Sequence, residues 1–212
     1  MDKKRIVSIF STLKRGHPEP KSELDYRNSF ELLVAVVLSA QATDKGVNKA
    51  TPGLFAKAPD ATAMVALGEE GIREQIRSIG LFNNKAKNIL ALSHILLERH
   101  NGEVPQTREA LEALPGVGRK TANVVLNVAF GQHTLAVDTH VFRVSNRTGM
   151  AVAKTPTAVE KGLLKVVPAE FMDHAHHWMI HHGRYVCKAR KPDCENCTIR
   201  QWCNTWLEAD NR

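Results

Sequence analysis

The sequence predicts an all-α fold, and three observations lead to that prediction. Apolar residues recur mostly at spacings of three and four, the period of a helix with one buried face, as they do over residues 6–13 and 30–37. Alternation with a period of two, which indicates a half-buried strand, is almost absent. Glycine and proline divide the chain into segments of ordinary helix length, about nine to eleven in all.

The N-terminal half is expected to begin with an amphipathic helix over residues 1–16, whose polar interruptions leave no signal-peptide core. Residues 31–40, ELLVAVVLSA, form the strongest apolar run. This run is too short to cross a bilayer and contains a glutamate, so a buried helix is expected. The next helix contains Pro52, which predicts a late start or a kink. After a break at Gly80, helical spacing resumes over residues 89–96.

In the C-terminal half, one apolar helix is expected to end at Leu114 and another to begin near Gly118. The stretch TLAVDTHVF at residues 134–142 is ambiguous between strand and helix until helical spacing resumes at His140. A further break is expected at Pro156. The whole chain is therefore expected to consist of helices joined by short turns.

The composition fits an ordered globular chain with an affinity for polyanions. Apolar residues make up 43% and charged residues 24% of the 212 residues, and no long biased tract indicates disorder. The net charge of +7 favours nucleic acid among the possible partners. We expect a soluble intracellular protein without a membrane segment, built as one large domain or two small ones.

The segment TREALEALPGVGRKTANVVLNVAF predicts a tight hairpin between two helices. Pro115 stops the first helix, while Gly116 and Gly118 permit positive φ and a close approach of another backbone. The free N–H groups at the start of the second helix then suit a phosphate, and Arg119 and Lys120 add positive charge. The alternative is a plain αα-hairpin whose glycines only tighten the turn.

All four cysteines lie near the C-terminus, in the pattern C-x6-C-x2-C-x5-C: Cys187, Cys194, Cys197 and Cys203. This clustering favours a metal centre over disulfides. Structural zinc usually pairs two C-x2-C knuckles, and the segment has only one, so zinc is the less favoured metal. Four cysteines also satisfy a [4Fe–4S] cluster.

The first loop of this segment, KARKPD, carries three cations: Lys188, Arg190 and Lys191. A loop held by a metal centre would bind phosphates at low ordering cost, although a solvated charged loop is the simpler alternative. Five histidines crowd the preceding residues 173–185, and His177 and His181 have the spacing of a metal pair. Packing of these helix faces toward the cysteine segment or DNA is favoured over a second metal.

The motifs LPGVGRKTA and VDTHVFRVSNR, at residues 114–122 and 137–147, resemble those of the endonuclease III family of DNA glycosylases in sequence and in separation. The cysteine spacing also matches this family, in which it holds a [4Fe–4S] cluster. The resemblance implies a bifunctional DNA glycosylase and AP lyase of base excision repair, acting on oxidised pyrimidines. It assigns the catalytic nucleophile to Lys120 and the partner carboxylate to Asp138.

The implied chemistry suits these residue types. A lysine amine attacks the sugar carbon of the glycosidic bond only when it is deprotonated, and a helix N-terminus with partial burial would lower the pKa of Lys120. Asp138 would accept a proton or stabilise cationic sugar character in the transition state. The resulting Schiff base would allow β-elimination, which cleaves the strand 3′ of the abasic site.

An enzyme that acts on a base within a duplex must extrude the nucleotide and fill the gap. The stretches LSAQATD and SIGLFNNKA resemble family segments that enter the base stack, which assigns this role to Gln41 and Leu81. Ser39, Asp44 and His140 are further pocket candidates. Without the resemblance, Gln41 would be a helix-end amide and Leu81 a loop residue packed into the core.

The resemblance further implies two helical domains: residues 21–132 with the helix-hairpin-helix, and residues 1–20 with 133–212 around the cluster. DNA would cross a cleft between them, with Lys120 and Asp138 facing each other. The expected partner is duplex DNA with a damaged base or an abasic site, bound by a cytoplasmic, nucleoid-associated monomer. The alternatives are a monofunctional adenine-mismatch glycosylase and a non-catalytic DNA-binding or redox-sensing iron–sulfur protein.

Overall fold

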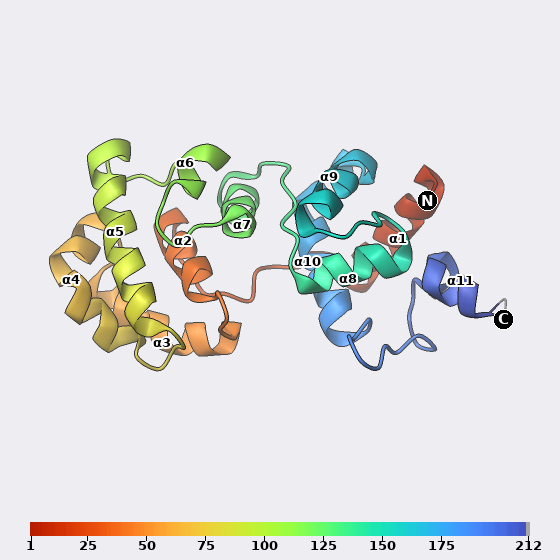
Figure 1. The fold of residues 1–212 in the computed structure, drawn as a ribbon, viewed down its shortest axis with the longest axis horizontal. Coiled ribbons are helices and arrows are strands. Elements are labelled where there is room, and N and C mark those ends of the chain that lie inside the picture. Colours follow the sequence, from red (N-terminus) through yellow and green to blue (C-terminus); the bar gives the residue numbers. More distant parts are fainter. Residues whose placement is uncertain (211–212) are drawn as a thin grey trace. The chain divides into compact units, whose positions relative to one another are not determined.

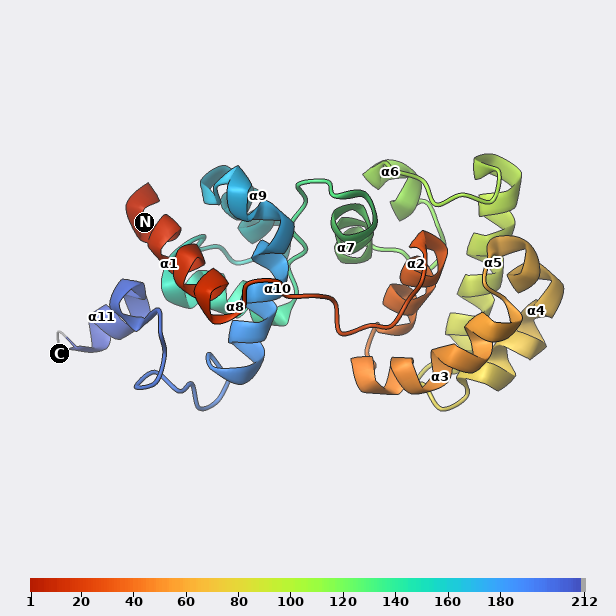
Figure 2. The same ribbon diagram turned by 180° about the vertical axis from the view of Figure 1, so that it is seen from behind.

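The computed structural model describes residues 1–210 and confirms the all-α prediction (Figures 1 and 2). Within that range it has eleven α-helices, one short 3-10 helix and no strand. The ambiguous stretch at residues 134–142 is extended without strand pairing until a helix begins at Thr139. None of the helices in the described range is long and apolar enough to cross a membrane.

The chain forms two compact units. Unit 1 comprises Met1–Lys21 and the described residues from Gln132 onward, and unit 2 comprises Ser22–Gly131. Unit 2 contains six helices: α2 (Ser29–Leu38), α3 (Asp44–Lys57), α4 (Ala61–Ile76), α5 (Phe82–His100), α6 (Arg108–Glu112) and α7 (Arg119–Phe130). Unit 1 contains α1 (Lys3–Gly16), α8 (Thr139–Thr148), α9 (Pro156–Val166), α10 (Ala169–Tyr185), the 3-10 helix Arg200–Trp202 and α11 (Asn204–Asp210).

The helices of unit 2 begin where short polar side chains cap them. The side chains of Asn28, Thr43 and Asp60 each accept a hydrogen bond from the backbone N–H three residues on, which satisfies one free donor of α2, α3 and α4. Helix α2 is apolar apart from Ser29 and Glu31, and it is buried along its whole length after Ser29, as its sequence predicts. It packs against α7, which carries the predicted hairpin lysine.

Two helices of unit 2 differ from the prediction. Helix α3 begins at Asp44 and continues through Pro52, so the expected late start is wrong; the Thr43 cap sets its beginning. Helix α4 is interrupted at Gly68, whose φ of 71° and ψ of 170° are not helical. An isolated glycine in an otherwise helical pattern gave no reason to place a break there.

Unit 1 is built around aromatic contacts between α1 and α10. The rings of Phe10 and Phe171 stack at 5.6 Å between centroids, and Trp178 packs against both. The indole N–H of Trp178 donates to the carbonyl of His17 at 2.7 Å, which ties the end of α1 to the middle of α10. Helix α8 contacts α10 as well, and Figures 1 and 2 both show the two helices side by side.

Candidate functional site

The glycine hairpin joins α6 to α7, and its two glycines have different roles. Gly116 has a φ of +80°, and a Cβ there would lie 3.1 Å from Asn88 Nδ2 and 3.3 Å from Val37 Cγ1. Gly118 has a φ of −98°, which any residue adopts, so it does not use the positive φ that glycine permits. A Cβ at Gly118 would meet nothing within 4 Å. The backbone and packing at position 116 therefore require glycine, whereas the space beside Gly118 is open to an additional side chain or a ligand.

This difference predicts opposite effects of two substitutions. Gly116→Ala puts a Cβ into left-handed backbone and against Asn88, so we expect a loss of about 1–2 kcal/mol in the free energy of unfolding and a lower Tm. Gly118→Ser supplies a better N-cap, so Tm should stay or rise, while the new side chain obstructs an approaching phosphate. Thermal melts and DNA titrations of both variants check this, and equal loss of stability in both would contradict it.

Lys120 is the second residue of α7 and is exposed. The partial burial expected for it is therefore wrong, because the hairpin turns the start of α7 toward solvent. No side chain caps this helix end. The neighbouring Arg119 has its Nη1 4.0 Å from Glu112 Oε1, and both side chains are about one third exposed. The first turn of α7 thus combines backbone N–H groups that no side chain caps with the exposed amine of Lys120.

Asp138 is the N-cap of α8 in unit 1. Its Oδ1 accepts from the backbone N–H groups of His140 and Val141, both at 2.8 Å, and its Oδ2 lies 3.2 Å from His140 Nδ1. Burial would raise the pKa of Asp138, but the hydrogen bond from Val141 and the charges of His176 and His140 outweigh it and lower this pKa. Asp138 is consequently a carboxylate whose charge is already stabilised, and it is a weak proton acceptor.

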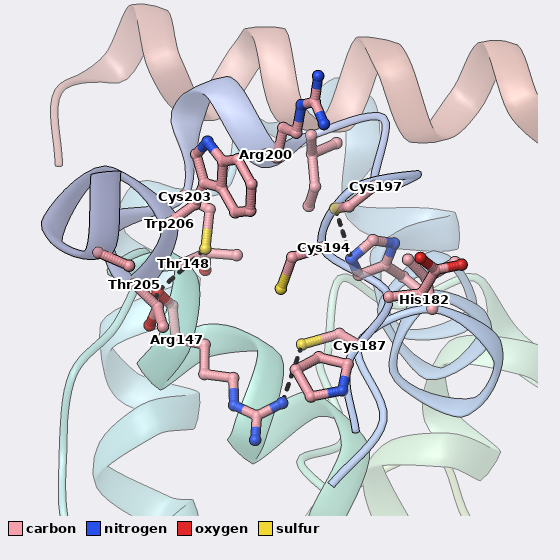
Figure 3. Close-up of a pocket in the computed structure, with 15 residues that line it drawn as sticks. Arg147, Thr148, His182, Cys187, Cys194, Cys197, Arg200, Cys203, Thr205 and Trp206 are labelled. Atoms are coloured by element: carbon pink, nitrogen blue, oxygen red, sulfur yellow. Dashed lines mark hydrogen bonds between the residues drawn. The ribbon is translucent and has the colours of Figure 1, made fainter. Parts of the chain in front are cut away.

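The four cysteines line one cavity of about 280 Å³ in unit 1, between the end of α8, the end of α10 and the start of α11 (Figure 3). All four side chains are partly buried. Burial, followed by the negative charges of the other three cysteines, raises the pKa of the Cys197 thiol to about 11. Four thiolates would therefore repel one another here unless a cationic centre were bound among them.

The four cysteine thiols form a donor set that suits a metal centre, either a zinc ion or an iron–sulfur cluster. Within residues 1–210, no group of three or more histidine, cysteine, aspartate or glutamate side chains converges on one ion position. A lone zinc would need all four sulfurs about 2.3 Å from one point. A [4Fe–4S] cluster would take one cysteine at each of its four irons.

Two side chains whose roles the sequence did not predict, those of Arg147 and His182, contact the cysteines. Arg147 donates from Nη1 to Cys187 Sγ at 3.5 Å, and its backbone carbonyl lies 3.3 Å from Cys203 Sγ. His182 Nε2 lies 3.7 Å from Cys197 Sγ (Figure 3). Burial and the charge of His181 lower the pKa of His182 to about 4, so its imidazole is neutral near pH 7.

Arg147 and Arg143 are spaced four residues apart on α8, which was the one available signal for their shared role. Arg143 donates to the carbonyls of Gly183 and Cys187 at 2.8 and 2.9 Å. Arg147 donates to the carbonyls of Lys188 and Ala189 at 2.7 and 2.8 Å. Helix α8, which Asp138 caps, therefore fixes the first cysteine and the start of the basic loop.

The three predicted cations of this loop, Lys188, Arg190 and Lys191, are all exposed. The histidines of α10 differ in their contacts, and the rings of His176 and His177 lie edge to face with centroids 5.3 Å apart. His176 is buried with Nδ1 2.8 Å from the carbonyl of Ala136, and His181 lies between the rings of His17 and Tyr185. His177 is partly buried, and burial followed by the charge of His174 lowers its pKa to about 4.

Gln41 and Leu81, predicted to enter the base stack, both have left-handed backbone, with φ of 54° and 61°. Both are exposed, Leu81 by 56%. The structure thus contradicts the alternative of a leucine packed into the core. Ser39 is the C-cap that follows α2, and its hydroxyl donates to the carbonyl of Val36 at 2.8 Å. Asp44 begins α3 and is partly exposed. All four residues belong to unit 2.

Comparisons with known proteins identify a family and similar solved structures. Residues 34–169 match the HhH-GPD superfamily of base excision DNA repair proteins. Endonuclease III of Haemophilus influenzae and that of Escherichia coli K12 are each 58% identical over 203 residues, 96% of this chain and 96% of theirs. A solved structure of a trapped covalent intermediate of endonuclease III with DNA has a TM-score of 0.91 and 46% identity, and the match covers 99% of both chains.

Proposed function

The chain belongs to the endonuclease III family of the HhH-GPD superfamily, and on that premise we propose a DNA glycosylase with AP lyase activity. Its substrate is duplex DNA that contains an oxidised pyrimidine or an abasic site. The single observation that carries the proposal is 58% identity to endonuclease III across 96% of both chains. The exposed Lys120 at the uncapped start of α7 supplies the group that a covalent intermediate needs.

Lys120 is the proposed nucleophile. The lone pair of its Nζ forms a bond to C1′ of the nucleotide, the glycosidic bond breaks, and its electron pair leaves with the base, which takes up a proton. Opening of the sugar ring gives a Schiff base between Nζ and C1′. Loss of a proton from C2′ then expels the 3′ phosphate, and water hydrolyses the Schiff base to release the amine. One lysine therefore serves both the glycosylase and the lyase step.

Asp138 is the proposed partner of this lysine. Of the two roles expected for it, the lowered pKa and the two N–H donors on Oδ1 support electrostatic stabilisation rather than proton acceptance. A fixed carboxylate favours the positive charge that develops on the sugar as the base departs. His140, whose Nδ1 lies 3.2 Å from Oδ2, orients this carboxylate.

We assign a [4Fe–4S] cluster to the four-cysteine cavity, held by Cys187, Cys194, Cys197 and Cys203. When bound, the cluster supplies four iron–sulfur bonds that fix the segment, and with four cysteine ligands it takes no part in the cleavage chemistry. Arg147 binds the carbonyls of Lys188 and Ala189, so the basic loop starts from a rigid anchor. Lys188, Arg190 and Lys191 then meet DNA phosphates with little further ordering.

Replacing one ligand should remove the cluster. Cys197→Ser is expected to lower bound iron from about four atoms per chain to less than one, to bleach the brown colour, and to expose the loop to protease. Thr198→Ala is the matched control, since Thr198 is exposed in the same segment and should leave iron content unchanged. Iron analysis, visible absorption and limited proteolysis provide the readouts. A fully iron-loaded Cys197→Ser protein would contradict the assignment.

The proposed function is tested by cleavage of a duplex that contains one thymine glycol, with each reaction divided and half of it treated with alkali. Strand breaks without alkali show both activities. Breaks that appear only after alkali would indicate the monofunctional alternative, and binding without breaks in either half would indicate a non-catalytic DNA-binding protein. The exposed Lys120 favours the first result.

A further inference from the structure

Three exposed non-glycine residues of unit 2 have left-handed backbone, and two of them, Gln41 and Leu81, lack the tolerance for it that asparagine gives the third, Asn101. Gln41 follows the end of α2 and Leu81 precedes α5, with φ of 54° and 61°. A left-handed conformation is unfavourable for a residue with a Cβ, and glycine usually occupies it. Neither position uses glycine. Strain that persists at exposed, non-glycine positions indicates that these two side chains are presented to a partner.

Lys85 on α5 is bonded to both strained segments. Its backbone N–H donates to the carbonyl of Leu81 at 3.0 Å, the first hydrogen bond of the helix. Its Nζ donates to the carbonyl of Leu38, the last residue of α2, at 2.9 Å. The Lys85 side chain therefore joins the start of α5 to the end of α2. Leu38 lies three residues before Gln41, and Lys85 lies four residues after Leu81.

Lys85 is an unusual residue for this place, because it is only 5% exposed. Burial of an ammonium group is costly, and desolvation lowers the pKa of Lys85. Part of that cost is offset because a cation at the C-terminus of α2 interacts favourably with the helix dipole. An apolar residue of similar length would fill the same space without the desolvation cost, so stability alone does not explain the lysine.

We propose that Lys85 is a positioning residue, which holds Gln41 and Leu81 at a fixed separation so that both enter the base stack together when the damaged nucleotide is extruded. The inference rests on the proposed function and on the roles proposed for Gln41 and Leu81. Lys85 itself does not touch DNA. It fixes the two backbone segments from inside unit 2, and loss of its bond to Leu38 frees the turn that carries Gln41.

The test uses a duplex with a tetrahydrofuran abasic analogue opposite 2-aminopurine. The tetrahydrofuran cannot form a Schiff base, and the fluorescence of 2-aminopurine rises when the base stack is opened. Lys85→Met should lose most of the rise seen with the wild type, and its kcat on a thymine-glycol duplex should fall about 10- to 100-fold with little change in KM. Its Tm should stay close to that of the wild type, because relief of desolvation opposes the lost hydrogen bond. Lys85→Arg keeps the cation and should keep most of the rise.

Lys87→Met is the matched control, since Lys87 is an exposed lysine on the same helix and its replacement removes the same charge. It should retain the wild-type rise. A Lys85→Met protein that opens the stack as well as Lys87→Met, or a loss of rise matched by an equal loss of folded protein, would overturn the positioning role. A wild type that cleaves thymine-glycol DNA without any rise overturns it too, and a wild type that does neither overturns the proposed function with it.

Discussion

Lys120→Ala is expected to lose strand cleavage by about 10³-fold or more, with Tm unchanged and DNA affinity reduced only modestly. The amine is the group that forms the bond to C1′, so no neighbouring side chain can replace it. Its exposure at the second position of α7 means that the substitution removes little packing. Single-turnover cleavage of an abasic duplex measures the loss.

Lys57→Ala is a suitable control for this substitution. Lys57 is an exposed lysine at the end of α3 in the same unit, so its removal changes the net charge equally. Its rate should stay near that of the wild type. If Lys120→Ala retained more than about one tenth of the wild-type rate, the nucleophile would be a different residue and the hairpin would serve binding alone.

Asp138→Asn is expected to show the second-largest effect, a fall of about 10²- to 10³-fold in kcat, with a smaller loss of stability than Asp138→Ala. Asparagine is as good an N-cap as aspartate, so it can still accept from His140 and Val141 while the charge is removed. Asp138→Ala removes the cap as well and should also lower the free energy of unfolding by about 1 kcal/mol. Comparing the kcat and the Tm of both variants separates the charge from the cap.

The pH dependence follows from the lowered pKa of Asp138. A carboxylate whose folded pKa is depressed contributes stability that is present above its unfolded pKa and is lost as pH falls through the folded pKa. Because its pKa is lowered, Asp138 also stays ionised at every pH above the ordinary range of an aspartate. The wild-type rate should show no fall from protonation of Asp138 above about pH 4. The electrostatic role would be contradicted if the wild-type rate fell as the pH dropped below neutral and this fall were absent in Asp138→Asn.

Where a feature was local, the sequence was enough to predict it. The apolar run at residues 31–40 became the buried helix α2, and the turn P-G-V-G became the hairpin before α7, because periodicity and turn chemistry act over a few residues. The four cysteines lie within 17 residues, and they do gather around one cavity. The family itself was identified from motifs, and the comparisons confirm it.

Features that depend on tertiary contacts escaped prediction. Lys85 lies in the segment NNKAKN, whose composition predicts an exposed polar surface. It is instead buried, and its Nζ bonds to the carbonyl of Leu38, 47 residues away in the sequence. The left-handed conformations of Gln41 and Leu81 have no signal in residue type, since glycine is the usual marker. His182 looked like one of five similar histidines, and only its contact with Cys197 sets it apart. The catalytic roles of Lys120 and Asp138 stay predictions.

The most direct test of the central claim is borohydride trapping on an abasic duplex, followed by digestion of the adduct and mass spectrometry of the linked peptide. The account predicts a covalent protein–DNA band whose nucleotide remnant is attached at Lys120. An adduct on a different lysine or on the N-terminal amine would contradict the assignment of the nucleophile. The absence of any adduct from an iron-loaded, DNA-binding protein would contradict the lyase mechanism as a whole.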